Sequence, residues 1–221
     1  MRELVAEDFL LLRPPLPLAD AEIHLWFFPQ WQTARAGTAE SSELRKLLAG
    51  YLGADLTDLR IEHGEHGKPR LAGAHALEFN LSHSGGALLV GVSRSQPLGV
   101  DLEAPRRSRP VLDLARRYFD PAEATALAAL PEVQRQRAFL RLWSCKEAVL
   151  KAHGRGIGYG LNRIAFELDA GGGVVRMRAD ASGNSPSPWQ VVRLAPSALH
   201  LGALAWNGPP CAIRAFVTAA E

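Results

Sequence analysis

The sequence has few cysteines and no long apolar run, so it lacks the features that cross-link a small protein or anchor one in a membrane. It has two cysteines in 221 residues, Cys145 and Cys211, and they form no CxxC pair. This usage disfavours zinc and structural disulfides and is typical of reduced, cytosolic thiols. No apolar run approaches the roughly 18 residues of a membrane-spanning helix, and the acidic start with Glu3, Glu7 and Asp8 is unlike a secretory signal peptide. We therefore expect a cytoplasmic protein without membrane association.

A large excess of charge of one sign is also missing, because the formal net charge is only +2. A broad basic footprint for nucleic acid is therefore not expected. The charge is unevenly divided, however: residues 1–100 carry a net charge of −3 and residues 101–221 a net charge of +5. The second half is the better candidate to hold an anionic ligand or an acidic partner. With 47% hydrophobic residues, the chain can bury a core as one domain or as two halves of roughly 100 residues.

Hydrophobic periodicity and turn residues predict helices and strands in both halves, and therefore an α+β fold. Asp120, Pro121 and Glu123 are typical of a helix start, and Gly154 is typical of a helix end. Residues 63–73 are predicted to be a loop, and residues 79–86 a turn. Helices are predicted over 40–52, 120–130 and 132–153, and strands over 23–28, 87–93, 99–103, 163–168, 174–179, 189–194 and 211–217.

Two carboxylates lie two residues apart at the end of a predicted strand. Residues at i and i+2 of a strand point to the same face, so Asp101 and Glu103 are expected to converge on one side. Two hard oxygen ligands that leave positions open for water and phosphate suit Mg²⁺. An acidic, solvent-facing strand end explains the same pattern.

The segment WSCKEAVLK (143–151) places Glu147 and Lys151 one turn apart on a predicted helix. This spacing is also that of an ordinary surface ion pair. Lysine is rare here: the chain has 25 cationic residues, and only four of them are lysines. Three of the four, Lys68, Lys146 and Lys151, fall inside candidate motifs. A lysine is a compact donor suited to a phosphate oxygen, which favours a ligand-binding role for these three.

A polar turn and a basic stretch are the remaining candidates. In FNLSHSGG (79–86), Ser82, His83 and the backbone amides of a glycine-rich turn are able to cradle a phosphate, although a purely structural turn explains them too. The arginines are either a solvated face or a docking surface for an acidic protein. They are residues 106, 107, 109, 116 and 117.

Five ordered motifs together resemble the 4′-phosphopantetheinyl transferases of the surfactin-synthetase-activating subfamily. The resemblance implies two α+β subdomains related by a pseudo-twofold axis, here residues 1–100 and 101–221, with the active site in the cleft between them. It also implies Mg²⁺-dependent transfer of phosphopantetheine from coenzyme A to a serine of a carrier protein, with release of 3′,5′-ADP. The motifs are GKPRL (67–71), FNLSHS (79–84), GVDLE (99–103), RRYF (116–119) and WSCKEAVLKAHGRG (143–156).

The resemblance also implies roles for particular residues. Asp101, Glu103 and Glu147 are similar to the metal-binding carboxylates, and Glu147 is also the candidate base for the carrier serine. Lys151 resembles the lysine that contacts the transferring phosphates. Further residues resemble those that contact coenzyme A: Ser82 and His83 near its phosphates, and Lys68 and Pro69 along its adenine.

One region departs from the family pattern. Members commonly carry a basic stretch before the GKP motif, aimed at the 3′-phosphate of coenzyme A. The corresponding segment here, QTARAGTAESSELRKL (32–47), is sparse in positive charge, and Arg35 and Arg45 are the candidates in it.

The combined interpretation is a monomeric, cytoplasmic holo-carrier-protein synthase that acts on acyl, peptidyl or aryl carrier proteins. A non-catalytic module that binds coenzyme A or a carrier protein is the alternative from a different class. A Mg²⁺-dependent phosphohydrolase of nucleotide esters is a second enzymatic alternative. The presence of all four of Asp101, Glu103, Glu147 and Lys151 favours the synthase over the non-catalytic module.

Overall fold

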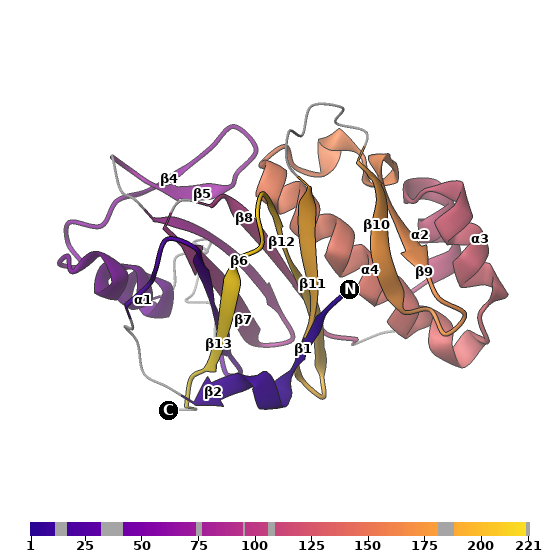
Figure 1. The fold of residues 1–221 in the computed structure, drawn as a ribbon, viewed down its shortest axis with the longest axis horizontal. Helices are drawn as coiled ribbons and strands as arrows, with labels where there is room; N and C mark the ends of the chain where they lie inside the picture. Colours follow the sequence, from indigo (N-terminus) through magenta and orange to yellow (C-terminus); the bar gives the residue numbers. More distant parts are fainter. Residues whose placement is uncertain are drawn as a thin grey trace.

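The computed structural model describes residues 1–11, 17–31, 42–73, 77–94, 96–105, 109–180 and 188–219. Two sheets pack face to face and helices cover their outer faces (Figure 1). The five-stranded sheet has the order β2 (Phe9–Leu11), β13 (Ala212–Val217), β3 (Glu22–Phe28), β7 (Ala87–Ser93) and β6 (Glu78–Ser84). The four-stranded sheet has the order β1 (Glu3–Val5), β11 (Trp189–Ser197), β12 (His200–Asn207) and β8 (Leu98–Glu103).

The helices lie on opposite sides of this pair of sheets. Helix α1 (Ser42–Leu52) covers the five-stranded sheet, and its leucines 44, 47 and 48 are fully buried. Helix α4 (Glu132–His153) packs on the four-stranded sheet. It is accompanied there by α2 (Val111–Tyr118), α3 (Pro121–Ala129) and the hairpin of β9 (Ile164–Leu168) and β10 (Val174–Asp180). In the part of the chain that is described, no helix combines the length and apolar character needed to cross a membrane.

The first and last strands each cross to the sheet that is built mainly by the other half of the chain. Strand β1 pairs in parallel with β11, and β13 pairs in parallel with β3 and β2. The predicted division between residues 100 and 101 falls inside β8, which pairs with β12. The two ends of the chain therefore tie the two sheets together.

Most predicted elements are confirmed. Asp120 caps α3 in a complete capping box with Glu123, and Gly154 ends α4 in the left-handed conformation with φ 73°. Two predictions are wrong. Residues 79–84 belong to strand β6 instead of a turn, and the predicted loop 63–73 contains one strand of a hairpin formed by β4 (Ile61–His63) and β5 (Pro69–Leu71). Strand β12 and helix α2 were not predicted.

A glycine sets the distance between β8 and α4. Gly99 lies on the face of β8 that α4 covers, and a β-carbon there would overlap backbone atoms of Ala148 and Ala152 and come within 2.9 Å of the Lys151 carbonyl carbon. Backbone atoms inside a helix cannot move aside singly, so any larger residue must lift the helix. The close approach brings the last two turns of α4 against the start of β8, two residues before Asp101.

We expect Gly99→Ala to lower the free energy of unfolding by about 3 kcal/mol, because the clash is with backbone and repacking of side chains cannot relieve it. Gly158→Ala is the matched control, since nothing lies within 4 Å of its β-carbon position. Urea unfolding of both variants checks this. Equal stabilities of the two variants would show that α4 does not need the glycine.

Candidate active site

The site is built where the edge strands of the two sheets meet. Alternate residues of β6 turn polar side chains toward the free edge of β8. The Asn80 Oδ1 atom accepts the Val100 N–H at 2.8 Å, and Ser84 Oγ accepts the Ala104 N–H at 3.0 Å. These bonds satisfy backbone donors that β8 cannot pair within its own sheet. The polar pattern that favoured a turn at 79–86 is therefore the pattern of a strand with a polar face buried against another strand.

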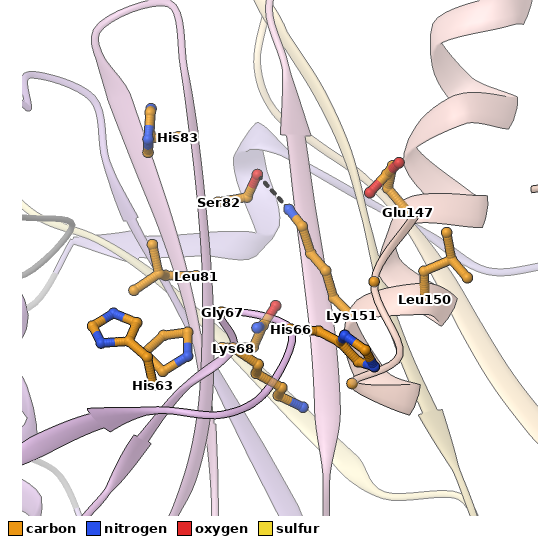
Figure 2. A pocket seen from close by; sticks show the side chains of 14 residues that line it. His63, His66, Gly67, Lys68, Leu81, Ser82, His83, Glu147, Leu150 and Lys151 are labelled. Atoms are coloured by element: carbon orange, nitrogen blue, oxygen red, sulfur yellow. Dashed lines mark hydrogen bonds between the residues drawn. The ribbon is translucent and has the colours of Figure 1, made fainter. Parts of the chain in front are cut away.

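Between these two bonds lies a three-membered network around Asp101. Ser82 Oγ donates to Asp101 Oδ1 at 3.1 Å. The Lys151 ammonium group donates to the same oxygen at 2.8 Å and to Ser82 Oγ at 2.9 Å, the latter shown by the dashed line in Figure 2. Asp101 is 5% exposed, and its second oxygen, Oδ2, is buried with no partner. The structure thus brings together three residues that lie far apart in the sequence.

Two further carboxylates lie close enough to repel Asp101. The pKa of Glu147 is raised to about 7, first by burial and then by the charges of Asp101 and Glu103, while Lys151 opposes this shift. Burial and then Asp101 raise the pKa of Glu103, while Arg109, 3.3 Å away, opposes this. Glu147 lies one turn before Lys151 on α4 and is only 8% exposed. The two residues are therefore not an exposed surface ion pair.

A cavity of about 490 Å³ lies beside this network, between the β4–β5 hairpin, β6 and the end of α4. Figure 2 shows the labelled side chains around it. Six of the predicted site residues line it, and Asp101 lies directly behind Ser82 and Lys151. The six are Lys68, Pro69, Ser82, His83, Glu147 and Lys151.

The hairpin wall of the cavity rests on two glycines of the opposite wall. A β-carbon on Gly154 would lie 3.7 Å from Lys68 Cδ, and one on Gly156 would lie 3.4 Å from His66 Cβ. Both glycines have positive φ angles, 73° and 65°. Lys68 also donates to the Leu98 carbonyl at 3.1 Å, and burial lowers the pKa of its ammonium group. Gly154 and Gly156, at the end of α4, therefore give the hairpin room to pack against this helix end.

Three cavity residues were missed as site candidates. Asn80, His63 and His66 all line the cavity. Asn80 belongs to a series of polar residues at i, i+2 and i+4 that also contains Ser82 and Ser84, and this period of two was the signal available for it. The two histidines belong to a segment that the sequence predicts to be a loop. Nothing in the sequence places their hairpin against α4.

Of the two candidates upstream of the cavity, one lies outside the described residues and the other is held away from the cavity. Arg35 lies in residues 32–41, outside the described part of the chain. Arg45 belongs to α1, where its guanidinium group donates to the carbonyls of Leu56 at 3.0 Å and Leu59 at 2.6 Å. The described residues lining the cavity do not include it.

The basic stretch is only partly described. Arg106 and Arg107 lie in residues 106–108, outside the described residues. Arg109 forms an ion pair with Glu103, one of the candidate metal ligands. It is therefore not simply a solvated cation.

The donor set fits a divalent cation, although in the arrangement present no three Asp, Glu, His or Cys side chains of the described residues are spaced to coordinate one. Asp101 Oδ2 and Glu147 Oε1 are both buried without a hydrogen-bond partner. Buried carboxylate oxygens carry a large desolvation cost unless a cation or donor meets them. Glu103 supplies a third carboxylate on the same face of β8 as Asp101.

Lys146 faces the opposite side of α4 and is fully buried. Its ammonium group lies 2.7 Å from Glu123 and donates to the carbonyls of Leu161, at 2.9 Å, and Ile164. Glu123 in turn accepts the Phe166 N–H at 2.7 Å. The prediction that this lysine binds the ligand is not supported by its position. Lys146 instead joins α4 to α3 and to the start of β9.

We expect Lys146→Met to lower the free energy of unfolding by about 3–5 kcal/mol, because it leaves a buried carboxylate unpaired. Lys151→Met removes a lysine that is partly exposed in the cavity, so we expect a loss at least 2 kcal/mol smaller. Chemical denaturation of both variants is the measurement. Equal losses would contradict the structural role assigned to Lys146.

Glu147 should make stability depend on pH. Its pKa of about 7 lies above the 4.5 of an unfolded glutamate, so the folded state holds the proton more tightly. The free energy of unfolding contributed by this group is therefore present below about pH 4.5 and is lost as the pH rises through 7. In a chelating buffer, we expect Glu147→Gln to be more stable than the parent by about 2–3 kcal/mol at pH 8 and equally stable at pH 4. A pH-independent difference would refute this.

Comparison with known proteins agrees with this arrangement. Residues 97–203, from β8 to the middle of β12, match the sequence profile of the 4′-phosphopantetheinyl transferase superfamily. The matched stretch contains Asp101, Glu103, Glu147 and Lys151. Together with the similarities to individual proteins given next, it confirms the resemblance that the ordered motifs suggested.

Individual relatives match over somewhat more than half of this chain. The 4′-phosphopantetheinyl transferase HetI of Nostoc sp. is 40% identical over 140 residues, which are 62% of this chain and 58% of that protein. The 4′-phosphopantetheinyl transferase Sfp of Bacillus subtilis is 31% identical over 132 residues, 59% of this chain and 57% of that protein. A phosphopantetheinyl transferase of Thraustochytrium sp. is 31% identical over 167 residues, 68% of this chain and 57% of that protein. The chain therefore spans only somewhat more than half the length of these relatives.

Proposed function

We propose that this protein transfers the 4′-phosphopantetheine group of coenzyme A to a serine of an apo carrier protein. The observation that carries the proposal is the joint position of Asp101, Glu147 and Lys151 at a cavity large enough to take a sizeable part of a nucleotide ligand. Named transferases among the relatives support the same reaction class.

The carboxylates of Asp101, Glu103 and Glu147 are the residues that would hold Mg²⁺. A bound Mg²⁺ would neutralise and polarise the pyrophosphate of coenzyme A. Lys151 and Lys68 are the cations that cover the remaining phosphate charge. Ser82 and His83, with Pro69 beneath the adenosine, complete the wall that orients the ligand.

The carrier serine needs a base, because its hydroxyl is a weak nucleophile at neutral pH. Its oxygen forms a bond to the phosphorus next to the pantetheine, and the bond from that phosphorus to the bridging pyrophosphate oxygen breaks. The serine proton passes to the Glu147 carboxylate, and 3′,5′-ADP leaves with the electron pair of the broken bond. A positioned carboxylate base contributes typically about 10²–10⁴-fold to such a rate.

The partners follow from charge and architecture. A net charge of +5 in residues 101–221 suits an acidic acyl, peptidyl or aryl carrier protein. Both walls of the cavity come from one chain, so we propose a monomer formed of two α+β halves with the site between them. The proposed location is the cytoplasm, where coenzyme A and reduced thiols such as Cys145 are found together.

A non-catalytic module that binds coenzyme A or a carrier protein would need the cavity but would not need Glu147. The protein keeps this carboxylate buried and unpartnered at Oε1, at a cost in stability. Retention of a costly group favours turnover over simple binding.

The deciding experiment incubates the protein with an apo carrier protein, coenzyme A and Mg²⁺ and measures the carrier mass. We expect a gain of one phosphopantetheine group and stoichiometric 3′,5′-ADP. Tight binding of coenzyme A with an unmodified carrier would establish the non-catalytic module instead. Release of free 4′-phosphopantetheine without carrier modification would establish a phosphohydrolase.

In the same assay, Asp101→Ala should reduce the transfer rate by at least about 100-fold at sub-millimolar Mg²⁺, because removal of one hard ligand leaves the ion poorly held. Glu167→Ala is the control, since this carboxylate is exposed on β9 and pairs with Arg176. Circular dichroism establishes that both variants are folded. Near-parental turnover of Asp101→Ala would remove this residue from the metal site.

A further inference from the structure

A buried tryptophan, Trp31, lies behind His83, one of the histidines that line the cavity. Trp31 follows β3 closely and is 6% exposed. Its backbone N–H donates to the Gly86 carbonyl at 2.7 Å, so it is fastened to the turn that joins β6 to β7. Gly85 and Gly86 form this turn with φ angles of 66° and 77°. The indole is therefore fixed by the backbone and by the core cluster around it.

His83 is exposed and stands near the end of β6, next to this turn. Its side chain belongs to the other face of β6 from Ser82 and Ser84, because successive strand residues alternate. It therefore takes no part in the bonds to β8. The contact that holds the imidazole is its tilted ring contact with Trp31, with ring centroids 4.8 Å apart and planes inclined at 40°.

We infer that Trp31 is a positioning residue for ligand binding: its indole holds the His83 imidazole at the cavity wall in the orientation that contacts coenzyme A. This inference rests on the proposed function. An exposed side chain that must be ordered on binding weakens affinity, and pre-ordering removes that loss. Loss of the ring contact should therefore weaken coenzyme A binding about three- to tenfold.

If Trp31 served only to pack the core, a different result would be expected. Its replacement would lower stability, yet any effect on coenzyme A would be the same whether or not His83 is present. A double-mutant cycle separates these cases, because only residues that act through one another show an interaction.

The cycle uses the parent, Trp31→Leu, His83→Ala and the double variant, with coenzyme A affinity measured by calorimetry in the presence of Mg²⁺. We expect Trp31→Leu to raise the dissociation constant three- to tenfold in the parent and less than twofold in the His83→Ala background. The KM for coenzyme A should rise by the same factor while kcat stays within about twofold. Trp31→Phe restores a ring and should recover most of the affinity.

Phe28→Leu is the matched control, because Phe28 is a similarly buried aromatic of the same cluster and lies two strands away from His83. It should leave affinity within twofold. Should Trp31→Leu fail to fold, Trp31→Met takes its place in the cycle, because it fills much of the same volume without a ring. Proton NMR of the unmutated protein gives a second reading: the imidazole resonance of His83 should be shifted upfield by the indole ring and should move on addition of coenzyme A.

Equal effects of Trp31→Leu with and without His83 would overturn the inference, as would an imidazole resonance without a ring-current shift. An unmutated protein that binds no coenzyme A would instead refute the proposed function, and this inference with it. Carrier modification that proceeds normally while the cycle shows no interaction would leave the proposed function standing and reject only the role of Trp31.

Discussion

The bonds from side chains of β6 to the free edge of β8 are the constraint on which the site depends. Each of these strands is the edge of a different sheet, and an unpaired edge leaves backbone donors without partners. Asn80 accepts the Val100 N–H of β8, Ser84 accepts the N–H of Ala104 directly after this strand, and Ser82 bonds the Asp101 side chain between them. A buried donor left unpaired costs about 1–3 kcal/mol. The two sheets are thus held at one spacing at the position where the chemistry is placed.

The second constraint is the close contact of α4 with β8 at Gly99. It places Glu147 and Lys151 above a strand that already carries Asp101, so three carboxylates and one ammonium group share a small volume. Burial, together with this crowding of charge, raises the pKa of Glu147, and two carboxylate oxygens are left unpartnered. Such an arrangement opposes folding and suits the binding of a cation and an anionic ligand. The buried Lys146–Glu123 pair on the other side of the helix offsets part of this by fixing α4 in place.

Local patterns in the sequence predicted the individual pieces well. The capping box at Asp120 and Glu123, the end of α4 at Gly154, and the shared face of Asp101 and Glu103 all follow from contacts within a few residues. The turn predicted at 79–86 was wrong because Asn80 and Ser82 alternate with Phe79 and Leu81, which is the period of a strand. Here the polar face of β6 is buried against β8, a contact between strands that are neighbours in neither sheet.

By itself, the sequence determined the α+β class, the ordered motifs and the residue types able to bind a metal and a phosphate, because these depend on composition, period and spacing. Only the tertiary structure decided which of the motif lysines faces the cavity, since Lys146 and Lys151 share one helix and differ in what packs around it. It also decided that the two ends of the chain cross between sheets, and that Trp31 lies behind His83. Contacts between distant segments leave no periodic pattern in the sequence. Which residues meet is therefore decided only when the sheets and helices pack together.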